Sequence, residues 1–419
     1  MNDIELLKKK CYSYAQNQQN CLVLNSNQIQ AAMGLNNYEF IFMCGCSDQF
    51  KTSEQTALAQ LKKFIEKNNG KWMGLSLSYD LKNELEQLES NNCNQLDFPL
   101  LNVFVPDTVI CIDKELKITC NNMAFWEAIN QQALAIQKPL PKLEFEARVT
   151  KDTYLNTIKQ IQNHILNGDV YELNYCIEFY KTACPEIEPV ALYENLNSVS
   201  PTPYSALWID QEQVIACASP ERFLLKKGSN IYSQPIKGTI KRMADCEADS
   251  KQKELLLNSE KERAENLMIV DLVRNDLSKS CETGSIQVDE LFGIYSFKNL
   301  HQMISTVSGK LKNDDIVESI CHAFPMGSMT GAPKIKAMEM IEQLEQTQRG
   351  MYSGCIGYIN PEGDFDLNVV IRSLQYNKLN QYLNFEVGSA ITIDSDPESE
   401  YNECLLKGEL MMQIFNRTA

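Results

Sequence analysis

Short apolar runs alternate with amphipathic stretches along the whole chain of 419 residues. Runs rich in β-branched and aromatic residues at 40–43, 103–105, 109–113 and 214–218 are typical of strands. Apolar positions with helical spacing predict a helix over 261–276, directly after a helical stretch at 251–258. No internal repeat or low-complexity tract interrupts the alternation. The pattern predicts an α+β or mixed α/β fold with large sheets.

The clearest change of pattern lies between residues 121 and 150. A predicted helix gives way there to a polar segment that carries two prolines, Lys138-Pro139-Leu140-Pro141. We therefore expect a boundary near residue 145. It separates an N-terminal portion, residues 1–145, from a C-terminal domain, residues 146–419, on which the N-terminal portion packs.

Composition narrows the classes of protein that remain. The 39 lysines and arginines stand against 55 aspartates and glutamates, a formal charge of −16, and no long basic run occurs, which argues against a nucleic-acid binder. No apolar run is long enough to span a membrane, and the N-terminal sequence lacks the apolar stretch of a signal peptide. The 15 cysteines are therefore expected to be reduced, mostly buried thiols of a cytoplasmic protein.

Two charged side chains lie at the ends of predicted strands. Glu221 follows a strand and sits at a turn beside Arg222, where a solvated ion pair is the usual interpretation. Lys237 lies between an isoleucine and a glycine in the run Gln234–Thr239. A desolvated lysine there would have a lowered pKa and an amine available as nucleophile or base, whereas an exposed strand lysine is the commoner case.

Acidic residues gather on the predicted helix over 261–276. Glu262 and Glu265 share one face of it, and apolar residues lie above Glu265 on that face. A carboxylate in such surroundings must be paired, protonated or bound to a metal. A structural salt bridge and a metal site both remain open.

A second acidic helix is predicted near the C-terminus. Asp396-Pro397 begins it, with aspartate as the N-cap and proline at the first helical position. At about 100° per residue, Glu400, Glu403 and Lys407 fall within about 60° of arc. The face is either a solvated Glu403–Lys407 pair or a surface that binds a metal and a carboxylate.

The glycine-rich segment 324–334 marks another helix start. Pro333 lies near the first helical position and Thr330 just before it, and the free backbone N–H groups of such a terminus suit an anion. The spacing G-x-x-x-G-x-x-K lacks the G-K-[ST] ending of a Walker A loop, so a nucleotide-binding P-loop is excluded.

The segments around Glu221 and Lys237, the helix over 261–276, the segment 324–334 and the last helix form a series along the chain. In their order and spacing they resemble the chorismate-utilising enzymes, which include anthranilate, aminodeoxychorismate, isochorismate and salicylate synthases. The resemblance covers about residues 146–416, with a weaker likeness at 74–81. Residues 1–145 are similar to the variable N-terminal portion of the family. The resemblance implies an anthranilate synthase component I-like fold, in which large antiparallel sheets pack face to face with helices outside.

The resemblance implies a site for chorismate, whose two carboxylates need local positive charge. Arg372 and Lys407, with the backbone of Gly388, match the positions that bind the ring carboxylate. Arginine suits this because its planar fork binds a carboxylate bidentately. The same matching implies further substrate contacts at Thr239, Thr330 and Tyr352.

A magnesium site is implied between the two acidic helices. Glu265 and Glu403 match the metal positions, and Glu262 and Glu400 are implied as outer or water-mediated partners. A hard cation with oxygen ligands and retained waters fits these carboxylates. Mg²⁺ there would join the glutamates to the second carboxylate of chorismate, which explains how so acidic a protein binds an anion.

One position sorts the members of the family. Aminodeoxychorismate synthases carry lysine in the run P-I-K-G-T, where anthranilate synthases carry alanine, and this sequence has Lys237. The resemblance implies that its amine attacks C2 of the ring while the C4 hydroxyl departs, protonated by Glu221. Ammonia then adds at C4 and expels the lysine, which gives 4-amino-4-deoxychorismate for para-aminobenzoate and folate biosynthesis. Lys237 must be uncharged at the attack and the pKa of Glu221 raised, and burial favours both.

Three further positions refine these expectations. His301 matches a histidine that lines the site, with a catalytic or a structural role. Glu172 stands where isochorismate and salicylate synthases place a water-activating lysine and where other relatives commonly have glutamine, which argues against that branch. The family's glycine-rich run reads Gly388-Ser389-Ala390-Ile391, so Ser389 and Ala390 are expected to narrow the carboxylate pocket.

Two absent motifs bear on partners and alternatives. The chain lacks the amidotransferase motif G-x-C-x-G, so ammonia is expected from a glutamine amidotransferase subunit or from solution. The L-L-E-S motif of tryptophan-inhibited anthranilate synthases is also absent. Two alternatives stay open: an anthranilate synthase component I, and a non-catalytic chorismate-binding protein.

Overall fold

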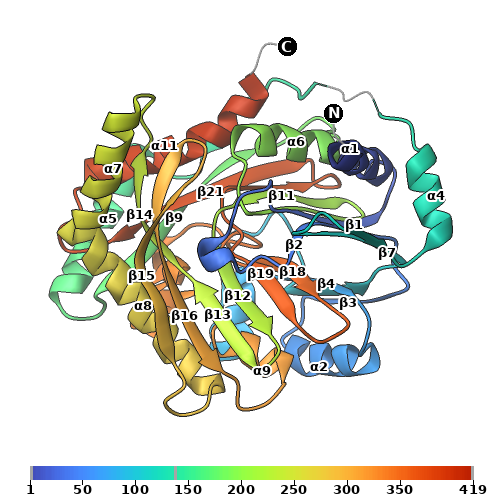
Figure 1. Cartoon of the computed structure of the whole chain (residues 1–419). Coiled ribbons are helices and arrows are strands. Elements are labelled where there is room, and N and C mark those ends of the chain that lie inside the picture. The colour runs from blue at the N-terminus through green and yellow to red at the C-terminus, as the bar shows by residue number, and fades with distance from the viewer. Residues whose placement is uncertain (1–2, 136–138, 417–419) are drawn as a thin grey trace.

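Two large sheets packed face to face form the centre of the molecule, and helices cover their outer faces (Figure 1). The computed structural model describes residues 3–135 and 139–416. The pairings within both sheets are antiparallel, as the register of each strand pair shows. The predicted α+β class with antiparallel sheets face to face is confirmed.

The first sheet, sheet A, begins at the short strand β17 and ends at β7. Its spatial order is β17 (Gly331–Ala332), β9 (Glu172–Lys181), β21 (Tyr382–Ile391), β20 (Ser373–Asn377), β11 (Gln213–Ser219), β10 (Tyr204–Asp210), β1 (Asn20–Asn25), β2 (Tyr38–Cys44), β6 (Thr108–Asp113) and β7 (Ile118–Cys120), with β8 (Glu146–Ala147) also paired to β9. The strands predicted at 40–43, 109–113 and 214–218 are β2, β6 and β11.

The second sheet, sheet B, runs from β14 to β3. Its spatial order is β14 (Ile236–Lys241), β16 (Leu300–Lys310), β13 (Asn230–Gln234), β12 (Arg222–Lys227), β19 (Phe365–Asn368), β18 (Cys355–Ile359), β4 (Met73–Leu77), β5 (Leu101–Val105) and β3 (Asp48–Thr52), with β15 (Gln287–Ser296) also paired to β16. The strand predicted at 103–105 is part of β5.

The helices divide between the two sheets. Those on sheet A are α1 (Asp3–Ala15), α5 (Lys151–Leu166), α6 (Pro189–Val199) and α11 (Pro397–Asn416), and those on sheet B are α2 (Ala57–Lys67), α7 (Cys246–Asn258), α8 (Glu260–Ser280) and α9 (Ile316–Cys321). The remaining α-helices in the described residues are α3 (Lys82–Glu86), α4 (Met123–Gln131) and α10 (Lys334–Leu344). Within residues 3–135 and 139–416, no helix is both long and apolar enough to cross a bilayer.

The two helices predicted at 251–258 and 261–276 are α7 and α8. They are separated at Ser259, whose side chain accepts a hydrogen bond from the backbone N–H of Glu262 and so caps α8. The start predicted for the last helix is also confirmed, because α11 begins at Pro397 and Asp396 accepts the N–H of Ser399 at 2.9 Å.

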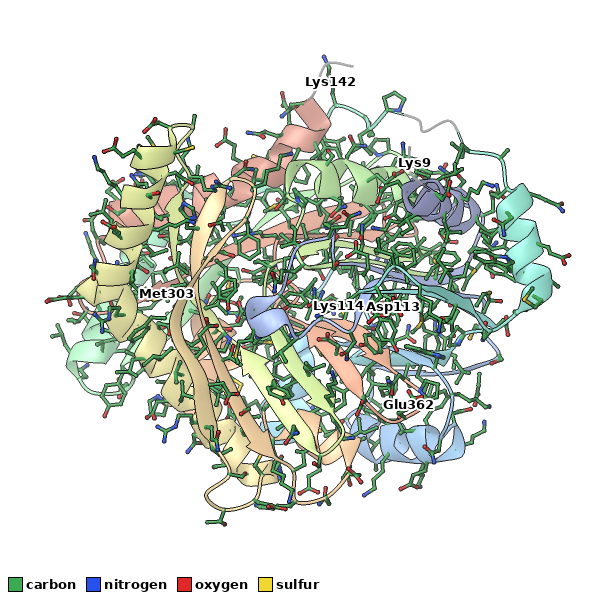
Figure 2. All side chains as sticks on the ribbon, in the orientation of Figure 1. Lys9, Asp113, Lys114, Lys142, Met303 and Glu362 are labelled. Carbon is green, nitrogen blue, oxygen red and sulfur yellow. The ribbon has the colours of Figure 1, made fainter. Side chains whose placement is uncertain are left out.

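Apolar side chains fill the layer between the sheets (Figure 2). The rings of Phe104 in β5 and Trp208 in β10 meet edge to face, with centroids 5.4 Å apart, so they join sheet B to sheet A. Leu22 and Ile356 belong to the same buried cluster. The sheets are therefore held at a fixed separation, on which the geometry of the site below depends.

Strands from residues 1–145 lie in both sheets. β1, β2, β6 and β7 form one end of sheet A, and β3, β4 and β5 form one end of sheet B. The N-terminal portion is thus joined to residues 146–416 by backbone hydrogen bonds between strands, as between β1 and β10 and between β4 and β18. The domain boundary near 145 stays a prediction.

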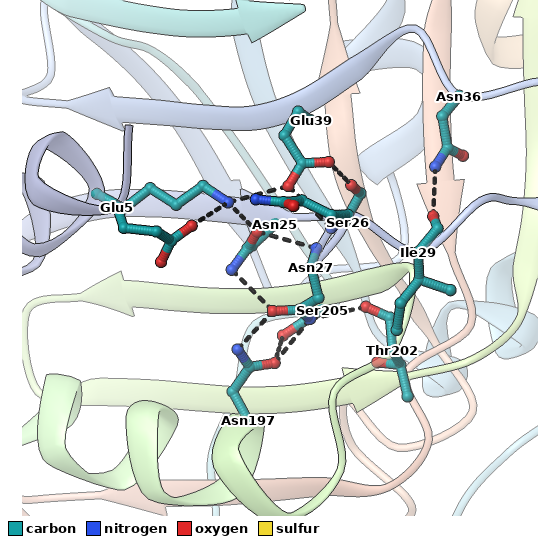
Figure 3. A network of polar contacts seen from close by, with 12 residues as sticks. Glu5, Asn25, Ser26, Asn27, Ile29, Asn36, Glu39, Asn197, Thr202 and Ser205 are labelled. Atoms are coloured by element: carbon teal, nitrogen blue, oxygen red, sulfur yellow. Dashed lines mark hydrogen bonds and ion pairs between the residues drawn. The ribbon is translucent and has the colours of Figure 1, made fainter. Parts of the chain in front are cut away.

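A buried polar network fixes α1 to strands β1 and β2 of sheet A (Figure 3). Lys8 forms an ion pair with Glu39, with 2.9 Å between Nζ and Oε1, and donates to Asn25 Oδ1 at 3.2 Å. Glu39 Oε1 also accepts the N–H of Gln28, and its Oε2 accepts the hydroxyl of Ser26. Each oxygen of this buried carboxylate therefore has a partner.

Candidate active site

The predicted site residues gather where an edge of sheet A approaches an edge of sheet B. Glu172 begins β9 of sheet A and Lys237 lies in β14 of sheet B. Lys237 Nζ is 2.7 Å from Glu172 Oε1, and the two side chains are 11% and 2% exposed. The charge of Lys237 also acts on the carboxyl groups of Glu221, Glu262, Glu265 and Glu403.

An irregularity in β14 directs Lys237 towards this site. The register with β16 shifts between Ile236 and Thr239, which is a bulge in the strand. Gly238 has φ of +94°, a conformation that favours glycine, and a Cβ there would lie 3.1 Å from Glu262 Oε2. Glycine therefore lets β14 lie directly against α8.

The pKa of Lys237 is raised, which contradicts the expectation from its sequence. Burial alone would lower this pKa, but the ion pair with Glu172, helped by the charges of Glu265 and Glu221, outweighs burial. Lys237 is therefore an ammonium in the resting site, with Glu172 in reach of its proton. The expectation was wrong because the deciding partner lies 65 residues away, on the other sheet.

Glu221 is buried at the turn between β11 and β12. Its Oε1 accepts the hydroxyl of Ser328 at 2.7 Å. Burial raises the pKa of Glu221 to about 7, although the bond from Ser328 and nearby cations oppose the rise. This agrees with the raised pKa expected of a general acid. The solvated pair with Arg222 does not form, because Arg222 is buried and bound to Asp366 at 2.8 Å.

The guanidinium of Arg372 forms no hydrogen bond or ion pair with any residue in the described part of the chain. Burial lowers its pKa to about 10, partly offset by the charge of Glu221, so the group stays positive at neutral pH. Its backbone is left-handed, with φ of +50°, a conformation that costs energy in a residue with a side chain. A partly buried cation without a carboxylate partner is a site for an anionic ligand.

Lys407 reaches from α11 to the backbone of β21. Its Nζ donates to the carbonyl of Gly388 at 2.8 Å and lies 2.7 Å from Glu403 Oε1. A Cβ on Gly388 would lie 2.5 Å from the sulfur of Cys176, so glycine permits the close approach of side chains on β9. Of the predicted trio, Arg372 thus lies directly before β20, Gly388 in β21 and Lys407 in α11.

The substituted glycine-rich run affects this pocket less than expected. Ser389 Oγ lies 3.3 Å from the hydroxyl of Tyr154 in α5, on the helix-covered face of sheet A. The expectation that Ser389 narrows the carboxylate pocket is therefore wrong. Ala390 lies on the same face as Gly388, since alternate residues of a strand share a face.

Three carboxylates from α8 and α11, Glu262, Glu265 and Glu403, are close enough to feel the charge of Lys237, and a fourth, Glu400, acts on Glu262. Burial raises the pKa of Glu265 to about 7 and also raises that of Glu262. The side chain of Glu403 is 52% exposed, and the nearby charge of Lys407 outweighs partial desolvation and lowers the pKa of Glu403. Glu400 Oε1 accepts a hydrogen bond from Ser395 at 2.8 Å.

These side chains supply the oxygen donors that a hard cation such as Mg²⁺ prefers. Across residues 3–135 and 139–416, however, no three acidic, cysteine or histidine side chains converge closely enough to hold a metal ion. The donor chemistry fits Mg²⁺, while the arrangement does not enclose one.

Two predicted site residues are engaged elsewhere. His301 is fully buried, with Nε2 2.9 Å from Asp249 Oδ1 and Nδ1 2.9 Å from Ser296 Oγ, which is the structural alternative for this histidine. The hydroxyl of Thr330 donates to the carbonyl of Met326 at 3.2 Å instead of capping α10, whose N-cap is Pro333.

The remaining predicted contacts differ in exposure. Tyr352 is buried, with its hydroxyl 4.0 Å from the sulfur of Cys176. Thr239 is exposed on β14. Ser328, which donates a hydrogen bond to Glu221, was not predicted from the sequence, although it lies in the segment 324–334 that was predicted to suit an anion.

Comparison with known proteins supports one family along nearly the whole chain. The family model described as chorismate binding enzyme matches residues 11–413. The rice (Oryza sativa subsp. japonica) protein named "Probable aminodeoxychorismate synthase, chloroplastic" is 40% identical over 69% of this chain and 33% of its own length. The "Aminodeoxychorismate synthase component 1" of Escherichia coli (strain K12) is 34% identical over 78% of this chain and 72% of its own.

A solved structure agrees with the sequence comparisons. Anthranilate synthase component I from Streptococcus pneumoniae TIGR4 superposes with a TM-score of 0.75 and 26% identity, over 90% of this chain and 92% of its own. The chain spans only 33% of the length of the rice relative, so the activities of such longer proteins do not transfer to it directly. Because the family model extends from within α1 to within α11, through both sheets and every segment of the site, the chain belongs to the chorismate binding enzyme family.

Proposed function

We propose that this protein aminates chorismate at C4 to give 4-amino-4-deoxychorismate, a step towards para-aminobenzoate and folate. The observation that carries the proposal is Lys237, a lysine directed into the site between the sheets with a carboxylate, Glu172, 2.7 Å from its amine. The names of the relatives from rice and Escherichia coli support the same reaction.

Chorismate binding is assigned to two cations, Arg372 directly before β20 and Lys407 in α11. Arg372, whose guanidinium lacks a partner among the described residues, would take the ring carboxylate as a fork, with Lys407 and the backbone of Gly388 beside it. Mg²⁺, held by Glu265 and Glu403 with Glu262 and Glu400 behind them, would supply positive charge for the second carboxylate. The metal remains a proposal on the chemistry of these donors.

The chemistry divides between three side chains. Lys237 passes a proton to Glu172 Oε1, and its free amine forms a bond to C2 of the ring. The two conjugated double bonds shift, and the C4 hydroxyl leaves as water with a proton from Glu221, which is protonated because its pKa is raised to about 7. Ammonia then bonds to C4, the C2–Nζ bond breaks, and Glu172 returns the proton to Lys237.

A glutamine amidotransferase subunit is proposed as the source of ammonia. The name of the Escherichia coli relative, "Aminodeoxychorismate synthase component 1", supports an enzyme of more than one component. Free ammonium in solution would serve in the absence of that subunit. The cytoplasmic location expected from the sequence stays a prediction.

The decisive experiment is the identity of the product. The purified chain is incubated with chorismate, Mg²⁺ and ammonium, and the products are separated and weighed by mass spectrometry. Formation of 4-amino-4-deoxychorismate without pyruvate is the expected result. Anthranilate with release of pyruvate would overturn it in favour of anthranilate synthase, the activity named for the Streptococcus pneumoniae neighbour. Tight binding of chorismate without turnover would favour a non-catalytic binding protein.

A further inference from the structure

Sheet B borders a cleft at the opposite end of β12 from Glu221. The cleft lies between α2, the turn from β12 to β13, the start of α9 and the turn from β18 to β19, and its volume is about 710 Å³. A cleft of this size suits a small metabolite. About 13 Å of extended strand separates Arg222, at the start of β12, from Lys226, which lines the cleft. The cleft is therefore separate from the candidate active site.

Lys226 is a buried cation at this cleft that donates no hydrogen bond within residues 3–135 and 139–416. Its side chain is 5% exposed, and Nζ lies 3.6 Å from Asp364 Oδ1 and 3.8 Å from Asp314 Oδ1, both too long for a hydrogen bond. The two other lysines that are as deeply buried in the described chain, Lys8 and Lys82, donate hydrogen bonds as short as 2.9 and 2.7 Å. Since unsatisfied buried donors are costly, the ammonium of Lys226 is available to a ligand with oxygen acceptors.

A ligand can reach Lys226 without breaking a strong contact. The side chain of Asp314 is 87% exposed, so a ligand can take its place at 3.8 Å from Nζ at little cost. Asp364 is held where it is, because the backbone N–H of Gly228 donates to its Oδ1 at 2.7 Å. Asp364 therefore continues to balance part of the charge of Lys226 when a ligand is bound.

The charges around the cleft restrict what this ligand can be. Two lysines and four carboxylates line it, namely Lys62, Lys226, Glu66, Asp314, Asp315 and Glu362. A ligand with negative charge alone would be repelled by this excess of carboxylates, and one with positive charge alone would leave Lys226 unsatisfied. Glu66 and Glu362, the latter labelled in Figure 2, form no ion pair within the described chain, so their carboxylates are free to hold an ammonium group.

We propose that this cleft binds a small zwitterion, with its carboxylate on Lys226 and its ammonium group on Glu362. The assignment adds a binding site to the protein and does not depend on the reaction proposed for the site between the sheets. Ile65, Ile316 and Val317 line the same cleft and offer apolar surface to the carbon chain that joins the two charged groups.

The first test is a survey of the full-length protein by thermal denaturation. The probes are the common L-amino acids, β-alanine, 4-aminobutyrate and 6-aminohexanoate, each at about 10 mM, with butyrate and butylamine as analogues that carry one charge. A ligand of the folded chain raises its Tm, so at least one zwitterion should raise it while butyrate and butylamine do not. The absence of a rise with every zwitterion would overturn the proposal. An equal rise with butyrate or butylamine would also overturn it, because one charge would then suffice.

Two variants locate the strongest zwitterion of that survey, with calorimetric titration as the measurement. Lys226→Met and Glu362→Gln each remove one charged hydrogen bond, so the Kd should rise about tenfold or more in either. Lys226→Met should fold, because its carboxylate neighbours reach water, and Glu362→Gln changes only an exposed side chain on a turn. An unchanged Kd in either variant would overturn the assignment.

Lys62→Met is the matched control. Lys62 lines the same cleft and carries the same charge as Lys226, but its ammonium is already bound to Asp315, with 2.6 Å between Nζ and Oδ2. The Kd of this variant should stay within about threefold of wild type, since Lys62 is exposed and its charge is screened. A loss as large as that in Lys226→Met would overturn the proposal, because binding would then depend on the total charge of the cleft and not on the unsatisfied ammonium.

Discussion

Two buried lysine–glutamate pairs in this protein have nearly equal lengths and opposite surroundings. Lys8 and Glu39 are 2.9 Å apart with side chains 3% and 7% exposed, and Lys237 and Glu172 are 2.7 Å apart with side chains 11% and 2% exposed. In the first pair, each carboxylate oxygen has a partner besides or in place of the lysine and the amine has several, as Figure 3 shows around Glu39. In the second pair, Glu172 Oε2 has no partner among residues 3–135 and 139–416.

The difference separates a structural ion pair from a reactive one. A buried charge pair repays the loss of its hydration only when further hydrogen bonds satisfy the remaining donors and acceptors. The pair at Lys8 meets that condition and fixes α1 to sheet A. The pair at Lys237 does not meet it, so its unsatisfied oxygen and its movable proton remain available to a substrate.

The largest effect should come from replacing the reactive lysine. Lys237→Met keeps the methylene chain and removes the amine, so turnover of chorismate should fall roughly a thousandfold or more. The free energy of unfolding should fall as well, because Glu172 is left buried without its cation, but circular dichroism should still show the native fold and chorismate should still bind. The measurement is the rate of 4-amino-4-deoxychorismate formation. Turnover near the wild-type rate would contradict the covalent role of Lys237.

The matched change at the structural lysine should affect folding instead. Lys8→Met leaves Glu39 buried without its cation, which should lower the free energy of unfolding by about 3–5 kcal/mol. Urea denaturation followed by fluorescence measures this loss. The rate per folded molecule should be unchanged, because Lys8 and Glu39 belong to the network that joins α1 to β1 and β2. A selective loss of rate without a loss of stability would erase the distinction between the two pairs.

The elements of the fold could largely be predicted from local sequence. Runs such as 40–43 and 214–218 became β2 and β11, because apolar β-branched residues suit strands buried on both faces. The break between α7 and α8 at Ser259 and the start of α11 at Pro397 follow from capping, which is also local. The pairing order of the strands joins residues far apart and was not predictable from such patterns.

Residues of the candidate site could be named from the sequence, but the pKa shift of Lys237 could not be predicted from it. Lys237, Glu221 and Arg372 could be named from motifs, and the raised pKa of Glu221 follows from burial. The raised pKa of Lys237 could not be anticipated, because it depends on Glu172 in the opposite sheet. The hydrogen bonds that engage His301 likewise come from residues on other elements.

The pH dependence of the rate sharpens the comparison, because the reactive pair works beside an acid that titrates near neutrality. Glu221 must be protonated to release the C4 hydroxyl, and burial raises its pKa to about 7. The kcat/KM for chorismate should therefore fall as pH rises through about 7, approaching a tenfold loss per pH unit. Saturating Mg²⁺ is needed in the assay, since Glu265, with a pKa also raised to about 7, must lose its proton to bind a metal. A flat profile between about pH 6 and 9 would exclude Glu221 as the acid.

The smallest effect should come from Ser328, whose hydrogen bond adjusts the pKa of Glu221, the acid beside the reactive pair. The hydroxyl of Ser328 donates to Glu221 Oε1 at 2.7 Å and favours the ionised carboxylate, which opposes the rise caused by burial. Ser328→Ala removes this bond, so the pKa of Glu221 should rise further and the falling limb of the profile should move to higher pH. The ratio of variant to wild-type kcat/KM should therefore increase between about pH 6.5 and 8.5. Ser296→Ala, which removes a hydroxyl bound to His301 and not to Glu221, serves as the control with an unchanged profile. A shift of the limb to lower pH in Ser328→Ala would mean that the hydroxyl stabilises the protonated acid, and the proton would then leave Glu221 against that bond at each turnover.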